Sequence, residues 1–185
     1  AQYLGVEHLA LFTNGTIALV TALQALKITG EVITTPYSFV ATSHSLLWNN
    51  AKPVFVDIDD RYQIDVSLIE SAITSKTKAI LPTQLNGRCC DMDEIMKIAN
   101  ELNIPVIEDC AEALGSYYKG QPVGIFGDAA TFSFYGNKTI TTGEGGMVVF
   151  KDKVVAERAA MLRDHGMKKT KRYWHEEVGY NYRLT

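Results

Sequence analysis

Short apolar runs alternate with stretches of helical period along this chain. The runs are rich in β-branched residues and predict strands at Glu31–Thr35, Pro53–Asp57, Lys78–Pro82, Pro105–Glu108, Ala129–Phe134 and Gly146–Phe150. The other stretches predict helices at Thr16–Leu26, Ala41–Asn49, Val66–Ile73, Met92–Leu102 and Lys153–His165. Strands that are apolar at nearly every position and are separated by helices are typical of a parallel sheet covered on both faces. The sequence therefore predicts an α/β fold with a mostly parallel mixed sheet flanked by helices on both faces.

Composition and charge narrow the class of protein further. The 185 residues suit one domain, and hydrophobic residues at 46% and charged residues at 21% are ordinary globular values. A net charge of -3 gives no reason to expect nucleic acid or a membrane surface as partner. No apolar run approaches the roughly 20 residues of a membrane span, and the N-terminus lacks a signal pattern. We expect a soluble, cytoplasmic domain.

The cysteines and histidines argue against disulfide or metal chemistry. Cys89, Cys90 and Cys110 form no CxxC pair, and adjacent cysteines rarely bond each other. The histidines are scattered singly, without HxH or HExxH spacing. We expect small buried thiols in a reduced compartment and no metal site.

Polar residues follow several of the predicted strands. They are Ser38 in "PYSF" with the aromatic Phe39 beside it, Gln84, the pair Glu108 and Asp109 after "IPVI", and residues 133–138, while "TNGT" (13–16) opens the first helix. In sheets of this class ligands bind beyond the carboxyl ends of the strands. We therefore expect these residues to converge on one crevice.

Each of these residues also has a structural explanation. Asn14, Gly15 and Thr16, at a helix start, could bind a phosphate through free N–H groups, but the same residues also make an ordinary N-cap. Asp109 needs a cationic partner if it is buried, or it caps the next helix. Phe39 could be a core residue as readily as a ring that stacks on a cofactor.

Lys138 is the hardest residue to explain structurally. It lies among small and hydroxylated residues in "FSFYGNKTITTGEGG" (132–146), where the glycines allow close backbone approach to a ligand. A surface lysine in a flexible loop is the ordinary explanation, but a lysine in a low-polarity pocket loses its proton readily and attacks carbonyls. The features match a cofactor with an aldehyde that needs an amine, a ring nitrogen that needs an acid, a flat ring that needs an aromatic neighbour, and a phosphate that needs a helix start. That cofactor is pyridoxal phosphate.

The joint pattern resembles the DegT/DnrJ/EryC1/StrS family of sugar aminotransferases, within the fold-type I pyridoxal phosphate enzymes. The matching stretches are "NGTIALVTALQAL", "EVITTPYSFVATSHSLLWNNAKPVFVDID", "TKAILPTQLNGRCCDMDEI", "IPVIEDCAEALGSYYKGQPVG", "GDAATFSFYGNKTITTGEGGMVV" and "VGYNYRLT". They cover nearly the whole chain in the family's order. The resemblance implies an aspartate-aminotransferase-like large domain over residues 1–185, without the family's small C-terminal domain.

The resemblance also implies roles for individual residues. Lys138 would form the Schiff base with pyridoxal 5'-phosphate, and Asp109 would pair with the ring nitrogen. The other implied contacts are Phe39 stacked on the ring, Gly15, Thr16 and Ser133 on the phosphate, Gln84 and Glu112 near the ring, and Asn181 on the phosphate of the neighbouring subunit. Glu112 stands where many relatives have glutamine or histidine.

The activity implied by the resemblance is transfer of an amino group, from glutamate, to a nucleotide-linked keto-sugar by a homodimer with shared sites. Because family members are about twice as long, the alternative is a truncated domain that folds and binds the cofactor without turnover. A related sugar dehydratase is a further alternative, but it has histidine in place of the lysine, so Lys138 argues against it. A nicotinamide enzyme is disfavoured because no GxGxxG follows a predicted strand.

Overall fold

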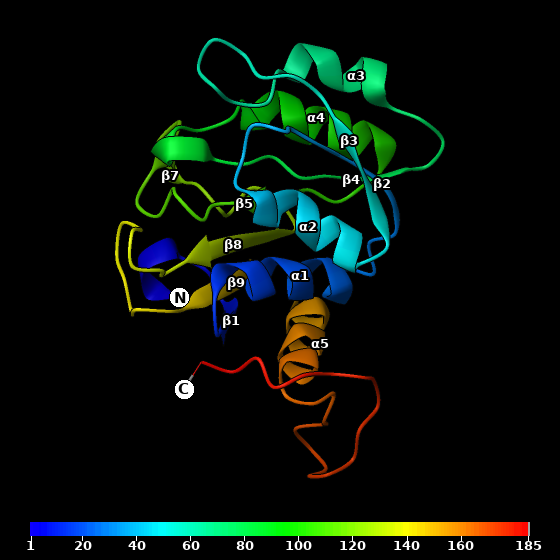
Figure 1. Cartoon of the computed structure of the whole chain (residues 1–185), viewed down its shortest axis with the longest axis vertical. Coiled ribbons are helices and arrows are strands. Elements are labelled where there is room, and N and C mark those ends of the chain that lie inside the picture. The colour runs from blue at the N-terminus through cyan, green and yellow to red at the C-terminus, as the bar shows by residue number, and fades with distance from the viewer. Residues whose placement is uncertain (185) are drawn as a thin grey trace.

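The computed structural model describes residues 1–184 and has an α/β architecture (Figure 1). Its strands are β1 His8–Phe12, β2 Gly30–Thr34, β3 Ala51–Phe55, β4 Thr77–Ile80, β5 Ile107–Asp109, β6 Tyr117–Tyr118, β7 Gln121–Pro122, β8 Ala129–Ser133 and β9 Gly146–Phe150. Its α-helices are α1 Gly15–Ala25, α2 Val40–Trp48, α3 Ile69–Ala72, α4 Met92–Leu102 and α5 Lys153–Arg163. Short 3-10 turns lie at Gln2–Leu4, Val66–Leu68 and Leu85–Gly87.

The central strands form a mixed sheet in two adjoining parts. Within residues 1–184, β3, β2 and β4 make a parallel three-stranded part, and β1, β9, β8 and β5 make a four-stranded part in which β9 runs antiparallel to both neighbours. Parallel bridges from Ile80 to Val106 and from Thr83 to Asp109 join β4 to β5. The predicted mostly parallel mixed sheet is confirmed.

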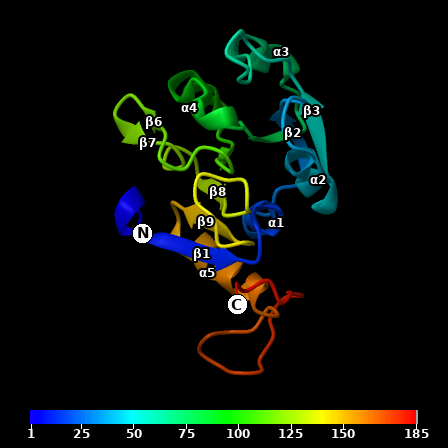
Figure 2. The ribbon, with the colours of Figure 1, turned by 60° about the vertical axis from the view of Figure 1, so that its left-hand side comes forward.

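Alternation along the strands divides the core between the two faces of the sheet. Leu81 and Ile107 belong to the core cluster that also contains residues of α1, α2 and α5. Their neighbours Ile80 and Val106 belong to the cluster that contains residues of α3 and α4. Figures 1 and 2 show α3 and α4 well separated from α1 and α5. Helices therefore cover both faces of the sheet. Successive side chains of a strand point to opposite faces, so the apolar strands place side chains on both.

Several elements differ from the sequence-based predictions; among them, the two-residue strands β6 and β7, which pair with each other, were not predicted. The predicted helix over residues 66–73 is a 3-10 turn followed by the single turn of α3, and it ends at Ile73, whose backbone is extended (ψ 133°). The strand β1 was not predicted. It lies at an edge of the sheet and pairs with β9, which is distant in sequence, so no local turn signal marks it.

Across residues 1–184, no helix combines the length and the apolar character needed to cross a membrane.

Candidate active site

A cavity of about 390 Å³ lies beyond the carboxyl ends of β5 and β8, beside the first turns of α1 and α2. The residues around it include Asn14, Gly15, Thr16, Ser38, Phe39, Thr42, Thr83, Asp109, Glu112, Ser133, Lys138 and Glu144. The structure thus brings together most of the site residues expected from the sequence. Asn181 is not among them, because it lies on the exposed segment after α5.

The alternation of side chains decides which residues after each strand reach this cavity. Thr83 and Asp109 share the face of Leu81 and Ile107, on the side of α1 and α2. Gln84 lies one residue further and points to the opposite face, where its Nε2 donates to Glu108 Oε2 at 3.0 Å. The expectation that Gln84 lies beside a cofactor ring is therefore wrong for its side chain.

The first turn of α1 forms one wall of the cavity. Asn14 is the N-cap residue, and its side chain accepts a hydrogen bond from the Ile17 N–H at 2.9 Å. Within the described part of the chain, no protein acceptor is found for the N–H groups of Gly15 and Thr16. A Cβ at Gly15 would lie 2.8 Å from Ser133 Cβ, so only glycine allows this close approach. The wall presents free N–H groups and the positive end of a helix, an arrangement that suits an anion.

Asp109 lies in the cavity with only 6% of its surface exposed. Thr42 Oγ1 donates to its Oδ2 at 2.8 Å, and the Ala111 N–H donates to its Oδ1 at 3.2 Å. Burial raises the pKa of Asp109, while the hydrogen bond from Thr42 and the charge of Lys138 act in the opposite direction. The residues that follow form turns rather than a helix, so Asp109 is not a helix cap. A buried carboxylate that faces a cavity suits a cationic ligand atom.

Lys138 enters the cavity from the loop between β8 and β9. Its side chain is 16% exposed, which excludes an ordinary surface lysine. Its Nζ lies 3.3 Å from Glu112 Oε1, and the Asn86 N–H donates to Glu112 Oε2 at 3.0 Å. Glu112 therefore links the lysine loop to the turn after β4 and holds the amine at the cavity.

Phe39 lies at the mouth of the cavity with 70% of its surface exposed. It directly precedes α2 and has extended backbone angles. This exposure excludes a core role. An aromatic ring left open beside a cavity suits a flat ligand ring.

Hydroxyl groups surround Asp109, and two of them, on Thr42 and Thr83, are functional candidates that the sequence analysis missed, whereas Ser38 was expected at the crevice. Ser38 Oγ lies 2.7 Å from Thr42 Oγ1 and 3.3 Å from Thr83 Oγ1. Thr42 connects these hydroxyl groups to Asp109, because its Oγ1 donates to the carboxylate. Thr42 lies four residues after Ser38, about one helical turn, and that spacing is the signal in the sequence that could have found it.

We expect Thr42→Val to move the acid limb of the pH–activity profile to higher pH. Valine keeps the shape of threonine but removes the O–H group that stabilises the Asp109 carboxylate, so the pKa of Asp109 rises further. A protonated Asp109 cannot pair with a cation, and activity is then lost at a pH where the wild type keeps it. Thr42→Ser retains the hydroxyl and should keep the wild-type profile. An unchanged acid limb in Thr42→Val would contradict this role.

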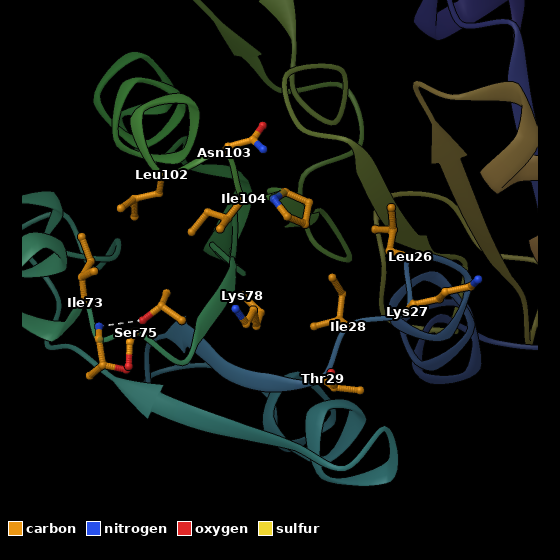
Figure 3. A pocket seen from close by; sticks show the side chains of 13 residues that line it. Leu26, Lys27, Ile28, Thr29, Ile73, Ser75, Lys78, Leu102, Asn103 and Ile104 are labelled. Atoms are coloured by element: carbon orange, nitrogen blue, oxygen red, sulfur yellow. Dashed lines mark hydrogen bonds between the residues drawn. The ribbon is translucent and has the colours of Figure 1, made fainter.

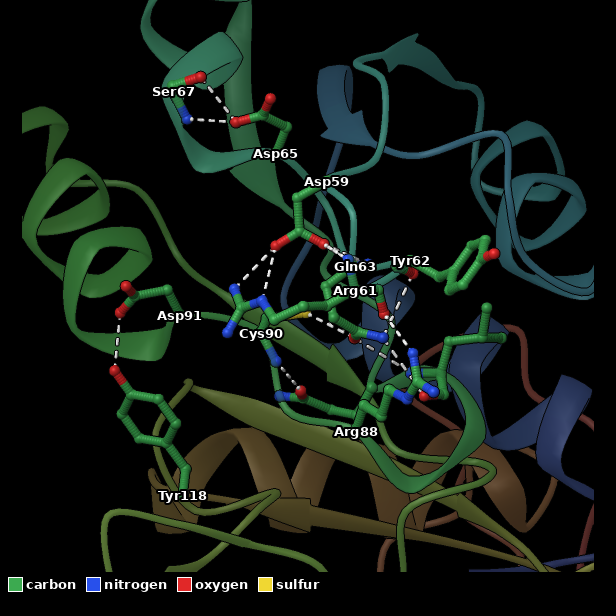
Figure 4. Close-up of polar contacts among 12 residues, drawn as sticks. Asp59, Arg61, Tyr62, Gln63, Asp65, Ser67, Arg88, Cys90, Asp91 and Tyr118 are labelled. Carbon is green, nitrogen blue, oxygen red and sulfur yellow. Dashed lines mark hydrogen bonds and ion pairs between the residues drawn. The ribbon is translucent and has the colours of Figure 1, made fainter.

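A buried polar network on the opposite face fixes the loop behind the cavity. Gln63 Oε1 accepts from the Leu85 N–H at 3.3 Å and from Cys90 Sγ at 3.4 Å, and Figure 4 shows Gln63 and Cys90 among these contacts. Gln84 Oε1 accepts from the Cys90 N–H at 2.8 Å. The loop that contributes Thr83 and Leu85 to the cavity is thus held from behind.

Glu108 is the buried carboxylate at the centre of this network. The N–H groups of Gly124, Phe126 and Gly127 donate to it at 2.9 Å, in addition to Gln84. Burial raises its pKa, although each of these hydrogen bonds favours the carboxylate. Glu108 and Asp109 are therefore adjacent acids with different surroundings: one is surrounded by donors, and the other faces the cavity.

We expect Glu108→Gln to destabilise the fold by about 2–4 kcal/mol, because an amide NH₂ would face backbone donors that now bind carboxylate oxygens. Urea unfolding measures the change. Glu101→Gln, at an exposed position on α4, is the matched control and should be neutral. A change below about 0.5 kcal/mol in Glu108→Gln would show that the network does not depend on the charge.

A larger hollow of about 500 Å³ lies at the opposite, amino-terminal edge of the strands (Figure 3). It is bordered by residues that precede β2 and β5 and by the start of β4, among them Ile28, Lys78 and Pro105. Most of the residues singled out by the sequence lie at the other edge of the sheet, so the cavity at the carboxyl edge is the candidate site.

Comparison with known proteins identifies the family to which the chain is similar. The chain matches the DegT/DnrJ/EryC1/StrS aminotransferase family over residues 1–185. It is 49% identical over 183 residues to the GDP-perosamine synthase of Escherichia coli O157:H7. The alignment covers 97% of this chain and 50% of that protein.

Solved structures of aminotransferases share the fold. Helicobacter pylori PseC, an aminotransferase involved in the biosynthesis of pseudoaminic acid, has a TM-score of 0.96 at 36% identity, over 99% of this chain and 51% of that one. The putative sugar aminotransferase Spr1654 from Streptococcus pneumoniae, in its PLP-form, has a TM-score of 0.92 at 31% identity, over 100% of this chain and 53% of that one.

The architecture is that of the pyridoxal phosphate aminotransferases. The chain belongs to the DegT/DnrJ/EryC1/StrS aminotransferase family. It spans about half the length of the curated relatives that it matches.

Proposed function

We propose that the protein is a pyridoxal phosphate-dependent aminotransferase that moves an amino group from glutamate to a nucleotide-linked keto-sugar. The observation that carries this proposal is the convergence, in one cavity, of the Lys138 amine, the buried Asp109 carboxylate and the free N–H groups of α1. The relatives support it, since one is named as a GDP-perosamine synthase and another as a putative sugar aminotransferase in its PLP-form.

The residues of the cavity fit this cofactor. When bound, pyridoxal phosphate supplies an aldehyde that condenses with amines and a ring that withdraws electrons from the substrate carbon. The N–H groups of Gly15 and Thr16, with the Ser133 hydroxyl, would hold the phosphate. Phe39 would cover one face of the ring, and Asp109 would hold a proton on the ring nitrogen.

Lys138 would act twice in the reaction. Its Nζ would hold the cofactor covalently at rest and be released when an amine donor arrives. Nζ would then take a proton from the substrate carbon that bears the amino group and return it during transfer. Glu112 would keep Nζ at the cavity, because its carboxylate lies 3.3 Å from the amine.

We also propose that two copies of the protein share their sites. Asn181 is exposed and lies outside the cavity of its own chain, where its Oδ1 accepts only from the nearby Arg183 Nε, at 3.1 Å, among the described residues, so it would be accessible to the phosphate bound by a second copy. Sedimentation equilibrium combined with mixed Lys138→Ala and Asn181→Ala chains tests this arrangement. A monomer whose cofactor affinity does not depend on protein concentration would refute it.

Incubation with pyridoxal phosphate, glutamate and GDP- or dTDP-linked keto-sugars tests the proposed reaction. Formation of 2-oxoglutarate together with an amino sugar, detected by mass spectrometry, is the expected result. Cofactor binding without turnover on any of these substrates would instead indicate the non-catalytic alternative. Loss of water from the sugar without amino transfer would indicate a dehydratase.

A further inference from the structure

We propose that the C-terminal segment (residues 177–183) positions the α1 corner (residues 13–16) of the same chain and thereby sets the affinity of that corner for a phosphate group. The proposal rests on the proposed function in that the α1 corner binds the phosphate of the cofactor. It assigns to the C-terminal segment a role within its own chain, distinct from any contact that Asn181 makes with a second copy.

A direct hydrogen bond joins the C-terminal segment to the α1 corner. The Tyr182 carbonyl accepts from the Thr13 N–H at 3.0 Å, directly before the N-cap Asn14. The segment is fixed along the end of α5, because the Tyr182 N–H donates to the Arg163 carbonyl at 2.9 Å. The Tyr182 ring packs against the core cluster that contains α1 and α5. In Figure 1 the chain after α5 makes a long loop and returns beneath this helix toward β1.

The same segment is tied to the other end of α1 through Arg158. The Nε and Nη2 atoms of Arg158 donate to both carboxylate oxygens of Glu177, at 2.7 and 2.5 Å. Its Nη1 donates to the carbonyls of Gln24 and Ala25, at 2.7 and 2.8 Å, where the helix ends and its carbonyls lack helical partners. Paired hydrogen bonds between arginine and carboxylate fix geometry strongly. The C-terminal segment therefore holds α1 at both ends.

Glycines leave little freedom in the path of the segment. A Cβ on Gly179 would overlap the backbone nitrogen of Gly166, and a Cβ on Gly166 would overlap the carbonyl of Glu177. On its other side the α1 corner packs against Gly146, where a Cβ would overlap the Asn14 carbonyl. The α1 corner is thus enclosed between β9 and the C-terminal segment.

This enclosure matters because N–H groups bind an anion only when they point at it. The residues that support a binding group must hold it within about 0.5 Å of the geometry that binding requires. A displaced segment would tilt the α1 corner through Thr13. Lys138 and Asp109 have their own supports in Glu112 and Thr42, so the part of the site that binds the ring would remain. The expected defect is therefore specific for phosphate.

The test compares pyridoxal phosphate with pyridoxal, which lacks the phosphate. Gly179→Ala displaces the segment, and Glu177→Gln weakens its attachment to Arg158. Val178→Ala lies between them at a side chain that is 80% exposed and is the matched control. Dissociation constants come from absorbance titrations, and thermal unfolding of the same samples verifies the fold.

We expect Gly179→Ala to weaken binding of pyridoxal phosphate about 10-fold or more and binding of pyridoxal less than about 2-fold. Glu177→Gln should show a smaller loss with the same preference, and Val178→Ala should match the wild type. Equal weakening for both ligands, or no weakening in folded variants, would overturn the proposal. If Gly179→Ala does not fold, Glu177→Gln decides the question.

The same titrations separate this proposal from the proposed function. A wild-type protein that binds both ligands equally would refute the phosphate site and this proposal together. A wild-type protein that prefers the phosphate form but shows no amino transfer would refute the reaction alone, and the variants would still decide the role of the segment.

Discussion

Lys138→Ala is expected to abolish covalent attachment of pyridoxal phosphate and to lower amino transfer by at least about 10³-fold. Lys138 is the one amine among the described residues that line the cavity, and its Nζ is both the nucleophile and the proton carrier in the proposed reaction. Borohydride reduction followed by mass spectrometry locates the attached pyridoxyl group, and a coupled glutamate assay gives the rate.

Lys138→Arg provides the matched control for charge. It keeps a cation beside Glu112 but offers no amine to an aldehyde, so it should fail in the same way as the alanine variant. Non-covalent binding of pyridoxal phosphate should persist in both variants, because the N–H groups of α1 do not depend on the lysine. An attached group found on another lysine, or near-normal turnover in either variant, would exclude Lys138 from this role.

The sequence predicted the fold well because most of the sheet is buried on both faces. Such strands are apolar at nearly every position and are separated by longer segments that form helices, of which α4 has the clearest period, so their order could be read directly. The strand β1 was missed because its partner β9 is far away in sequence and no turn connects them. The end of the predicted helix over residues 66–73 depended on the local backbone of Ile73, which composition does not specify.

The site could be predicted in part, for a similar reason. The rule that ligands bind at the carboxyl ends of strands located Asp109, Ser133 and Lys138 at one edge of the sheet. It did not say which of two adjacent residues faces the ligand. The register of each strand decides that, and it directs Gln84 and Glu108 to the opposite face. Thr42 was missed because its role depends on how α2 packs beside β5.

The charges around the cavity explain why a helix terminus is needed there. The described residues that line it include three carboxylates, on Asp109, Glu112 and Glu144, and one ammonium group, on Lys138. A phosphate would be repelled by this set if it approached the carboxylates directly. The α1 corner presents N–H groups and the positive helix end instead, close to Ser133. The position of the α1 corner therefore has a direct effect on the affinity for phosphate.

Asp109→Asn is expected to leave covalent attachment at Lys138 intact and to slow amino transfer by about 10²- to 10³-fold. Asparagine has nearly the same shape and can still accept one of the two hydrogen bonds, from Thr42 Oγ1 or from the Ala111 N–H, so the fold and the cavity should be retained. It carries no charge to keep the ring nitrogen protonated, and the ring then withdraws electrons from the substrate carbon less strongly. Stopped-flow absorbance with glutamate measures this first half of the reaction.

A rescue experiment distinguishes the charge of Asp109 from a structural role. A cofactor analogue methylated on the ring nitrogen is positively charged without any help from Asp109, so it should restore part of the rate of Asp109→Asn. Asp60 is exposed and does not line the cavity, so Asp60→Asn is the control for loss of one carboxylate and should behave as the wild type. A structural defect would not respond to the analogue, because the lost packing would remain lost. Near-normal rates in Asp109→Asn with the natural cofactor would instead show that the buried carboxylate serves only to hold Thr42 and the turn at Ala111.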